Sequence, residues 1–242
     1  MDGAGRVNND NYDDVIVGAA SASNNSRTVS GSAYVIYGGP GGGSASLDLA
    51  TLTQAQGFRI DAPEAANSLG ETVSGVGDVN EDGRDDVIVG AWTTSIHGAE
   101  ERAYAGAAYV VYGGAGTPAN LDLASLTEAR GFRIAGAYAT NFTGSSVAGA
   151  GDFDGDSSPD LIVGSPSADF NGREDSGRAN ILLNEVADQP PVAVNDAKTL
   201  DEDAGATAID VLGNDTDADA GPISIGSKTD GANGTVAITA GV

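Results

Sequence analysis

Oxygen-bearing side chains recur at a fixed spacing in three short loops of the chain. In the second loop, residues 78–86, the oxygen side chains at positions 1, 3, 5 and 9 are Asp78, Asn80, Asp82 and Asp86. Alternate oxygens on a tightly turning loop can converge on one centre, and Gly83 at position 6 permits the sharp bend. Oxygen ligands without His or Cys favour calcium over zinc or copper. The spacing therefore predicts a Ca2+ site, to which Arg84 at position 7 contributes its backbone carbonyl whatever its side chain.

The other two loops repeat this pattern with one departure each. The third loop, residues 152–160, has Ser157 in place of glycine, and its candidate ligands are Asp152, Asp154, Asp156, Ser158 and Asp160. The first loop, residues 6–14, has Arg6 at position 1, and its candidates are Asn8, Asp10, Tyr12 and Asp14. Because an arginine cannot ligate a cation, we predict calcium in the second and third loops and leave the first loop open.

The loops belong to an internal repeat. Residues 5–19, 77–91 and 151–165 read GRVNNDNYDDVIVGA, GDVNEDGRDDVIVGA and GDFDGDSSPDLIVGS. Short β-branched or aromatic runs bounded by Gly, Asn, Asp and Ser predict four strands per repeat. In the first two repeats these strands are expected at 15–17, 34–37, 58–60 and 72–75, and at 87–89, 109–112, 132–134 and 146–149, and the third repeat begins at 161–163. The segments LDLATLTQAQ and LDLASLTEAR are expected to form an outer helical turn.

The GDxNxDGxDDxIVGA pattern, followed by a GxAYVVYGG strand, resembles the FG-GAP repeat of integrin-α-type β-propellers. The resemblance covers residues 1–186 and implies calcium in the loops already named. It also implies an all-β fold. This fold is a partial β-propeller of about 2.5–3 four-stranded blades, at residues 1–66, 67–140 and 141–186. Closed propellers have about four to eight blades. We therefore expect this chain to be a piece of a longer protein, and we expect the first blade of the chain to lack its first strand. Self-association of partial propellers and a stable open arc are the alternatives.

The chain changes character near residue 187. All 13 aromatic residues (one Trp, seven Tyr and five Phe) lie at or before Phe170, whereas both lysines follow the dipeptide Pro190-Pro191. Residues 187–193 read as a linker, and residues 194–242, with VLGNDTDAD, resemble a truncated bacterial cadherin-like or VCBS-type module. This partial immunoglobulin-like β-sandwich is expected to have strands at 208–212, 223–225 and 235–239.

Composition limits the possible functions. The formal net charge is −24, with 35 acidic against 11 basic residues, which disfavours nucleic acid and anionic membranes but suits bound cations. There is no Cys and one His, so thiolate sites and multi-histidine zinc sites are excluded. No apolar run is long enough to span a membrane, and the N-terminus lacks a readable signal peptide.

These observations predict a non-enzymatic calcium-binding module of a secreted or cell-surface adhesin or ligand-binding protein. In this hypothesis, Ca2+ stabilises the propeller, and the partner is a protein or glycan at a cell surface or matrix. Two alternatives remain. The chain is the non-catalytic propeller portion of a secreted hydrolase, or it is a carbohydrate-binding lectin. Open blade edges also leave room for self-association.

Overall fold

The computed structural model describes residues 1–40, 46–98, 100–114, 120–184, 191–201, 203–216, 223–231 and 234–238. The chain divides into two compact units, Met1–Asn184 and Glu185–Val242. In the described parts of the first unit, the secondary structure is twelve strands and two short 3-10 turns, so the fold is all-β as predicted. No helix in the described residues is long and apolar enough to cross a membrane.

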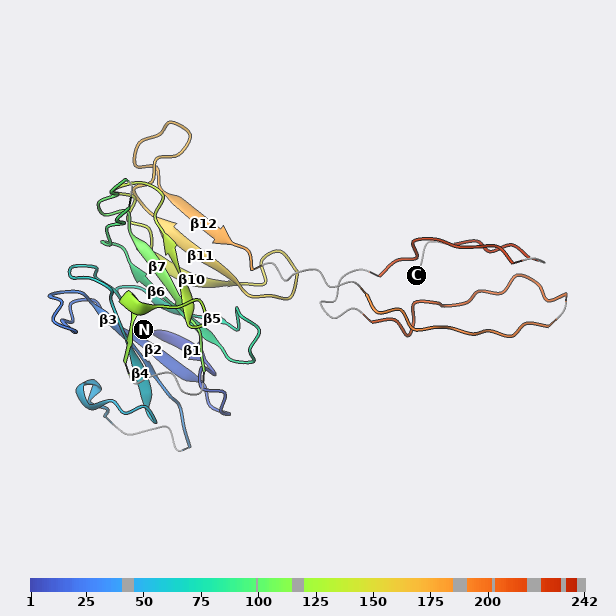
Figure 1. Cartoon of the computed structure of the whole chain (residues 1–242), viewed down its shortest axis with the longest axis horizontal. Helices are drawn as coiled ribbons and strands as arrows, with labels where there is room; N and C mark the ends of the chain where they lie inside the picture. The colour runs from blue at the N-terminus through green and yellow to red at the C-terminus, as the bar shows by residue number, and fades with distance from the viewer. Residues whose placement is uncertain are drawn as a thin grey trace. The chain divides into compact units, whose positions relative to one another are not determined.

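Three sheets form the first unit, one for each repeat (Figure 1). The first sheet has the order β1 (Asp2–Gly5), β2 (Asp14–Ala19), β3 (Ser32–Ile36), β4 (Gly57–Asp61) and β8 (Asn120–Asp122). The second has the order β5 (Val73–Gly77), β6 (Asp86–Ala91), β7 (Ala107–Val111) and β9 (Gly131–Ala135). The third has the order β10 (Ser146–Gly151), β11 (Asp160–Ser165) and β12 (Arg178–Leu182). The first strands contact one another, β1 with β5 and β5 with β10, as in the blades of a partial propeller.

The first blade contains the strand that the sequence analysis expected it to lack. β1 pairs antiparallel with β2, and its register shifts between Gly3 and Gly5. The same shift occurs in the second blade between Gly75 and Gly77, and in the third between Gly149 and Gly151. The segment DGAG has no apolar run, and only Ala4 within it is buried, so its residues alone do not predict a strand. In the third blade, the described residues form three strands.

The LDLA segments do more than form a turn. Leu49–Thr51 and Leu123–Ser125 are 3-10 turns, as expected, and each is capped by the preceding aspartate. The residues just before the second turn form β8, which the sequence analysis did not predict. β8 leaves its own repeat and pairs in parallel with β4 of the first blade. This pairing is a tertiary contact that no local pattern indicates.

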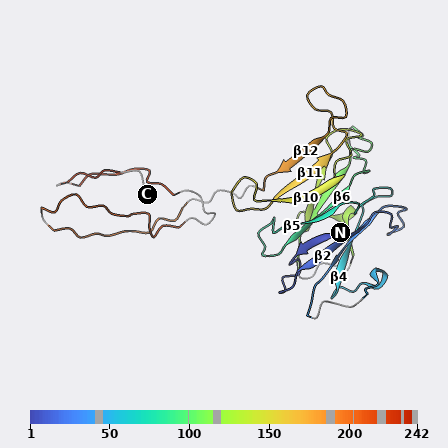
Figure 2. The same cartoon turned by 180° about the vertical axis from the view of Figure 1, so that it is seen from behind.

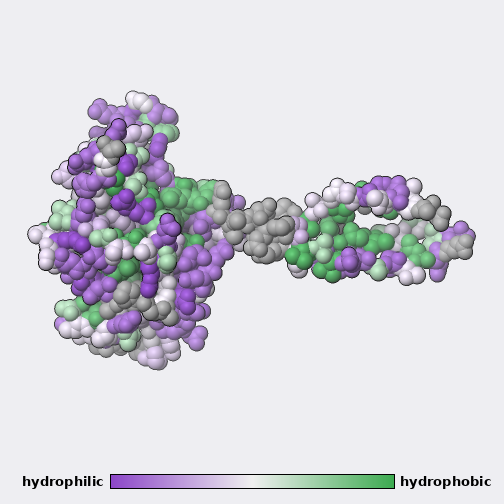
Figure 3. All heavy atoms as spheres, in the orientation of Figure 1, coloured by the Kyte–Doolittle hydropathy of each residue, from purple (hydrophilic) through white to green (hydrophobic). Residues whose placement is uncertain are grey.

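The core of the unit lies between the blades. The largest cluster joins apolar side chains of the first two blades, including Phe58, Ile60, Val87 and Val89, and a second joins blades two and three through Val110 and Val163. Hydrophilic residues predominate on the face of this unit seen in Figure 3, with hydrophobic residues interleaved among them. Figure 2 shows the same sheets from behind. The aspartate loops lie at strand junctions, where the packed sheets hold both loop ends in place.

The second unit differs from the prediction in its strands. The described residues of 208–212, 223–225 and 235–238 belong to no strand, and residue 239 lies outside the described residues. Backbone pairing in the described part consists of isolated bridges, Val192 with Thr216 and Gly231 with Gly234. Ile209, Val211 and Ile225 are exposed. A strand needs a partner and a buried face, and about 50 residues provide less of both than a complete sandwich of about 100.

Candidate metal centre

The third loop brings three carboxylates together. The ligand atoms of Asp152, Asp154 and Asp156 all lie within 4.8 Å of one another. The loop is held by its own backbone, because Gly155 and Ser157 donate N–H groups to Asp152 at 2.6 and 3.1 Å. Ser157 takes the left-handed conformation at φ 73°, so it occupies the glycine position despite its side chain. The result is a cluster of hard oxygen donors suited to a divalent cation.

The second loop has the same backbone framework. Asp82 and Gly83 donate N–H groups to Asp78 at 3.0 and 2.7 Å, and Arg84 donates its N–H to Asp82 at 3.1 Å. Asn80 accepts from the N–H of Asp82 at 3.2 Å. The Arg84 guanidinium also lies 3.5 Å from the Asp82 carboxylate. The guanidinium at position 7 thus forms an ion pair with the carboxylate at position 5.

The first loop keeps the framework but lacks an oxygen at position 1. Asp10 donates its N–H to Asn8 at 3.0 Å, and Tyr12 donates to Asp10 at 2.7 Å. The Arg6 side chain lies 3.9 Å from Asp13. Asn8 also donates its amide to Asp10 at 2.9 Å. This loop therefore has one side-chain oxygen position fewer than the other two.

The aspartates at position 9 have a structural role that the sequence analysis missed. Asp14, Asp86 and Asp160 are each no more than 1% exposed. Each carboxylate accepts two backbone N–H groups, one from loop position 2 and one from the second residue after the third strand of its blade. For Asp86 these donors are Val79 at 3.0 Å and Gly113 at 2.8 Å. The equivalent pairs are Val7 with Gly38 and Phe153 with Asn184. Position 9 thus ties each loop to its blade before any ion is considered.

We expect Asp86→Ala to destabilise the calcium-free protein by about 2–3 kcal/mol, because two backbone donors lose their partner. Chemical unfolding with a chelator present would measure this loss. Asp82→Ala in the same buffer is the matched control, and it should cost less than 1 kcal/mol because Asp82 is more exposed. Equal losses for both variants would contradict the structural role of position 9.

The pKa values of the loop aspartates are raised first by desolvation and then by neighbouring like charges. Burial raises the pKa of Asp86 to about 7, against the two backbone hydrogen bonds and together with the charges of Asp78 and Asp82. In the third loop, desolvation raises the pKa of Asp154, and repulsion from Asp156, Asp160 and Asp152 adds to it. A cation placed among these carboxylates would relieve that repulsion.

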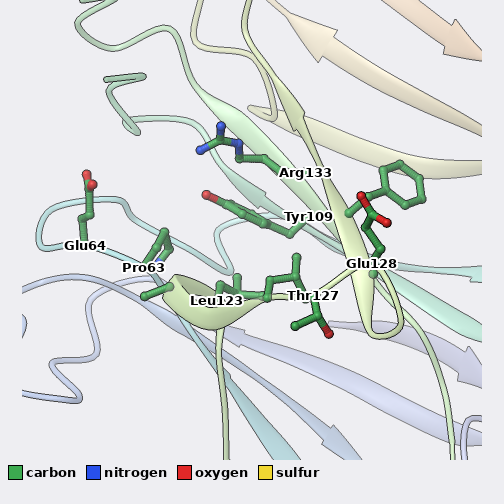
Figure 4. Close-up of a pocket in the computed structure, with 11 residues that line it drawn as sticks. Pro63, Glu64, Tyr109, Leu123, Thr127, Glu128 and Arg133 are labelled. Carbon is green, nitrogen blue, oxygen red and sulfur yellow. The ribbon is translucent and has the colours of Figure 1, made fainter. Parts of the chain in front are cut away.

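A separate pocket of about 500 Å³ lies at the junction of the first two blades (Figure 4). Its lining includes Tyr109, with Arg133 on one side of the ring and Leu123 and Thr127 on the other. Tyr109 is 2% exposed, and its hydroxyl has no hydrogen-bond partner among the described residues. Burial raises the pKa of this hydroxyl, and the nearby Arg133 charge opposes the rise. None of the described residues that line the pocket is a serine or a cysteine.

Trp92 and His97 lie outside both sites. The Trp92 indole donates to Glu71 at 3.0 Å and packs edge-on against Phe142, with ring centroids 5.5 Å apart. His97 is exposed between Glu64 and Glu101, at 3.4 and 3.7 Å. The first is a loop anchor and the second a surface histidine, as the residues alone indicate.

The third blade, with its acidic loop, matches a known repeat. Residues 143–181 are an FG-GAP repeat. Residues 188–242 match the bacterial Ig domain family. The chain therefore combines the two module types that the sequence resembles. Both are typical of extracellular or surface proteins, and both are typically non-catalytic.

The chain is also similar to phosphatidylinositol-glycan-specific phospholipase D of Bos taurus. The two sequences are 32% identical over 168 residues, which cover 69% of this chain. The chain spans 18% of the length of that relative. The similarity therefore concerns a portion of the phospholipase and says nothing about its remaining parts.

Proposed function

We propose that the chain is a non-enzymatic calcium-binding module of a secreted or cell-surface protein, in which Ca2+ in the second and third loops stabilises the propeller blades. The observation that carries the proposal is the convergence of Asp152, Asp154 and Asp156 within 4.8 Å. FG-GAP repeats often bind calcium, and the matched residues 143–181 include this loop. The ligand sets contain only oxygen, which suits calcium.

The loop residues have two different roles. The carboxylates at positions 1, 3 and 5 would hold the ion, with backbone N–H groups of the same loop orienting Asp78 and Asp152. The aspartate at position 9 ties the loop to its blade. Bound calcium would supply positive charge that offsets the repulsion among the carboxylates. Because it would bind the folded loop only, it would couple blade stability to calcium concentration.

An extracellular role is supported by the pairing of modules. Extracellular calcium is millimolar, which suits surface loops of modest affinity. The partner would be a protein or glycan at a cell surface or in a matrix. The net charge of −24 disfavours nucleic acid as a partner.

Calorimetric titration of Ca2+ into the chelator-treated, folded chain tests the proposal. We expect two ions per chain, with the tighter site in the third loop, because Arg84 weakens the second. Asp156→Ala should abolish the tighter site and Asp82→Ala the weaker one. At a calcium concentration 100 times the dissociation constant, each site should add about 2.7 kcal/mol of stability.

The exposed acid Glu174 provides the matched control, since it lies outside the three loops. Glu174→Ala should leave both sites unchanged. Absence of binding heat in a sample shown to be folded would overturn the calcium proposal. Binding that survives in the Asp82→Ala/Asp156→Ala double variant would place the ions elsewhere.

Two alternatives each rest on one observation. The similarity to the phospholipase favours a propeller portion of a secreted hydrolase, whose catalytic residues would lie outside this chain. The pocket that contains Tyr109 and Arg133 favours a lectin, since the exposed Arg133 guanidinium could bond sugar oxygens. Glycan binding by this chain alone would support the lectin. Hydrolysis by a longer parent, without activity in this chain, would support the hydrolase.

A further inference from the structure

The pairing of β8 with β4 shows how one blade accepts a strand from outside its own repeat. Asn120, Leu121 and Asp122 run parallel to Arg59, Ile60 and Asp61. The Asp122 carboxylate is held by Arg27 through two bonds of 2.8 and 2.9 Å. Arg27 also donates to the Ala62 carbonyl at 2.7 Å, which positions its guanidinium beside the sheet edge. Leu121 and Leu123 are buried, 7% and 5% exposed.

The second blade has the same acceptor without a strand on it. β9 has the sequence GFRIA where β4 has GFRID, and no described strand pairs with its outer side. Phe132 is 36% exposed, whereas the equivalent Phe58 is fully buried. The β9 edge therefore presents unpaired backbone groups next to apolar surface, a combination that favours strand addition.

The side chain of Arg102 lies at this edge. Arg102 precedes Gly106 by four residues, as Arg27 precedes Gly31. It donates to the Gly136 and Ala137 carbonyls at 2.9 and 3.1 Å, in the manner of Arg27. No described residue forms an ion pair with it. In the first blade a second carboxylate, that of Asp61, lies beside the arginine. The equivalent residue of the second blade is Ala135, so the surroundings of Arg102 carry one negative charge fewer.

We propose that the β9 edge and Arg102 bind an extended strand of a partner polypeptide that carries the sequence Leu-Asp. The partner strand runs parallel to β9, its aspartate bonds to the Arg102 guanidinium, and its leucine covers the Phe132 surface. The contact uses neither acidic loop, so it stands independently of calcium. In the first blade Asn25 also donates its amide to Asp122 at 3.1 Å. The exposed Glu100 stands at that place in the second blade and cannot donate, so the bond to the partner's aspartate rests on Arg102.

The probe is a fluorescent peptide with the sequence NLDLASLT, that of residues 120–127, titrated into the full chain and followed by anisotropy. Saturable binding at one site is expected. Replacing the peptide aspartate with asparagine should weaken binding about tenfold or more, because a hydrogen-bonded ion pair is lost. This peptide variant leaves the protein unchanged, so its result does not depend on the folding of any mutant.

Two matched arginine variants locate the site. Arg102→Gln should weaken the aspartate peptide about tenfold and leave the asparagine peptide unaffected, whereas Arg27→Gln should change neither affinity. Loss of binding in Arg27→Gln alone would mean that the peptide exchanges with β8, and would overturn the proposal. Absence of binding to the folded chain would overturn it as well.

A second copy of the chain is the competing occupant, because Leu47-Asp48-Leu49 has the same sequence as residues 121–123. Sedimentation of the chain alone distinguishes a second copy from a separate partner polypeptide. A monomer at the concentrations of the titration supports a separate partner. A dimer that dissociates in the Asp48→Asn variant would show that the occupant is a second copy of the chain, and would overturn the proposal of a separate partner.

Discussion

Replacing Phe58 with alanine should lower the free energy of unfolding of the 1–184 unit by about 3–5 kcal/mol. The Phe58 side chain is fully buried in the cluster between the first two blades, near Leu121 and Leu123. Its ring lies 6.3 Å from that of Tyr37. Truncation removes the buried area and leaves a cavity that two packed sheets cannot close. Denaturant unfolding, followed by the fluorescence of the single tryptophan, Trp92, would measure the loss.

Phe132→Ala is the matched control for this prediction. Phe132 occupies the same position in β9, and its ring also lies 6.3 Å from a tyrosine, Tyr112. It is nevertheless 36% exposed, because no described strand covers the β9 edge. We expect a loss of about 1–2 kcal/mol, since exposed carbon contributes less. Equal losses in the two variants would show that β8 does not protect the first blade as the structure indicates.

Gly90→Ala should destabilise the same unit by about 3 kcal/mol or more, at the upper end for overpacking. Gly90 lies in β6, and a Cβ there would overlap the Gly144 carbonyl oxygen and the Thr72 hydroxyl. Thr72 itself donates to that carbonyl at 3.0 Å, so neither atom is free to move. The glycine of the VIVG run is therefore required by the close approach of the next repeat. Loss of soluble folded protein or a lower unfolding midpoint would measure this effect.

The third repeat offers the control, Gly164→Ala. A Cβ at Gly164 would meet the Ser146 hydroxyl, while the nearest backbone atom, the Ser146 carbonyl oxygen, lies 3.7 Å away. A serine side chain can rotate away, so the cost should be about 1 kcal/mol. A Gly164→Ala loss as large as that of Gly90→Ala would refute the explanation by backbone overlap.

The repeated blades follow from the sequence alone. Runs such as VIVGA are short, β-branched and bounded by turn residues, and they form β2, β6 and β11 close to the expected bounds. The spacing of Asp152, Asp154 and Asp156 likewise predicts the cluster that the structure contains. These features are local, because a strand run and a tight loop are encoded within about ten consecutive residues. The ion itself remains a prediction.

Only the tertiary structure decided which residues complete each blade and what each aspartate does. β1 has too few apolar residues to be predicted, and β8 pairs with a strand almost 60 residues earlier in the chain, from Asp61 to Asn120. Asp86 resembles any other loop oxygen in the sequence, yet it is buried and bonded to Gly113 across the blade. Partners distant in sequence are set by the packing of sheets, and local residue spacing carries no record of them.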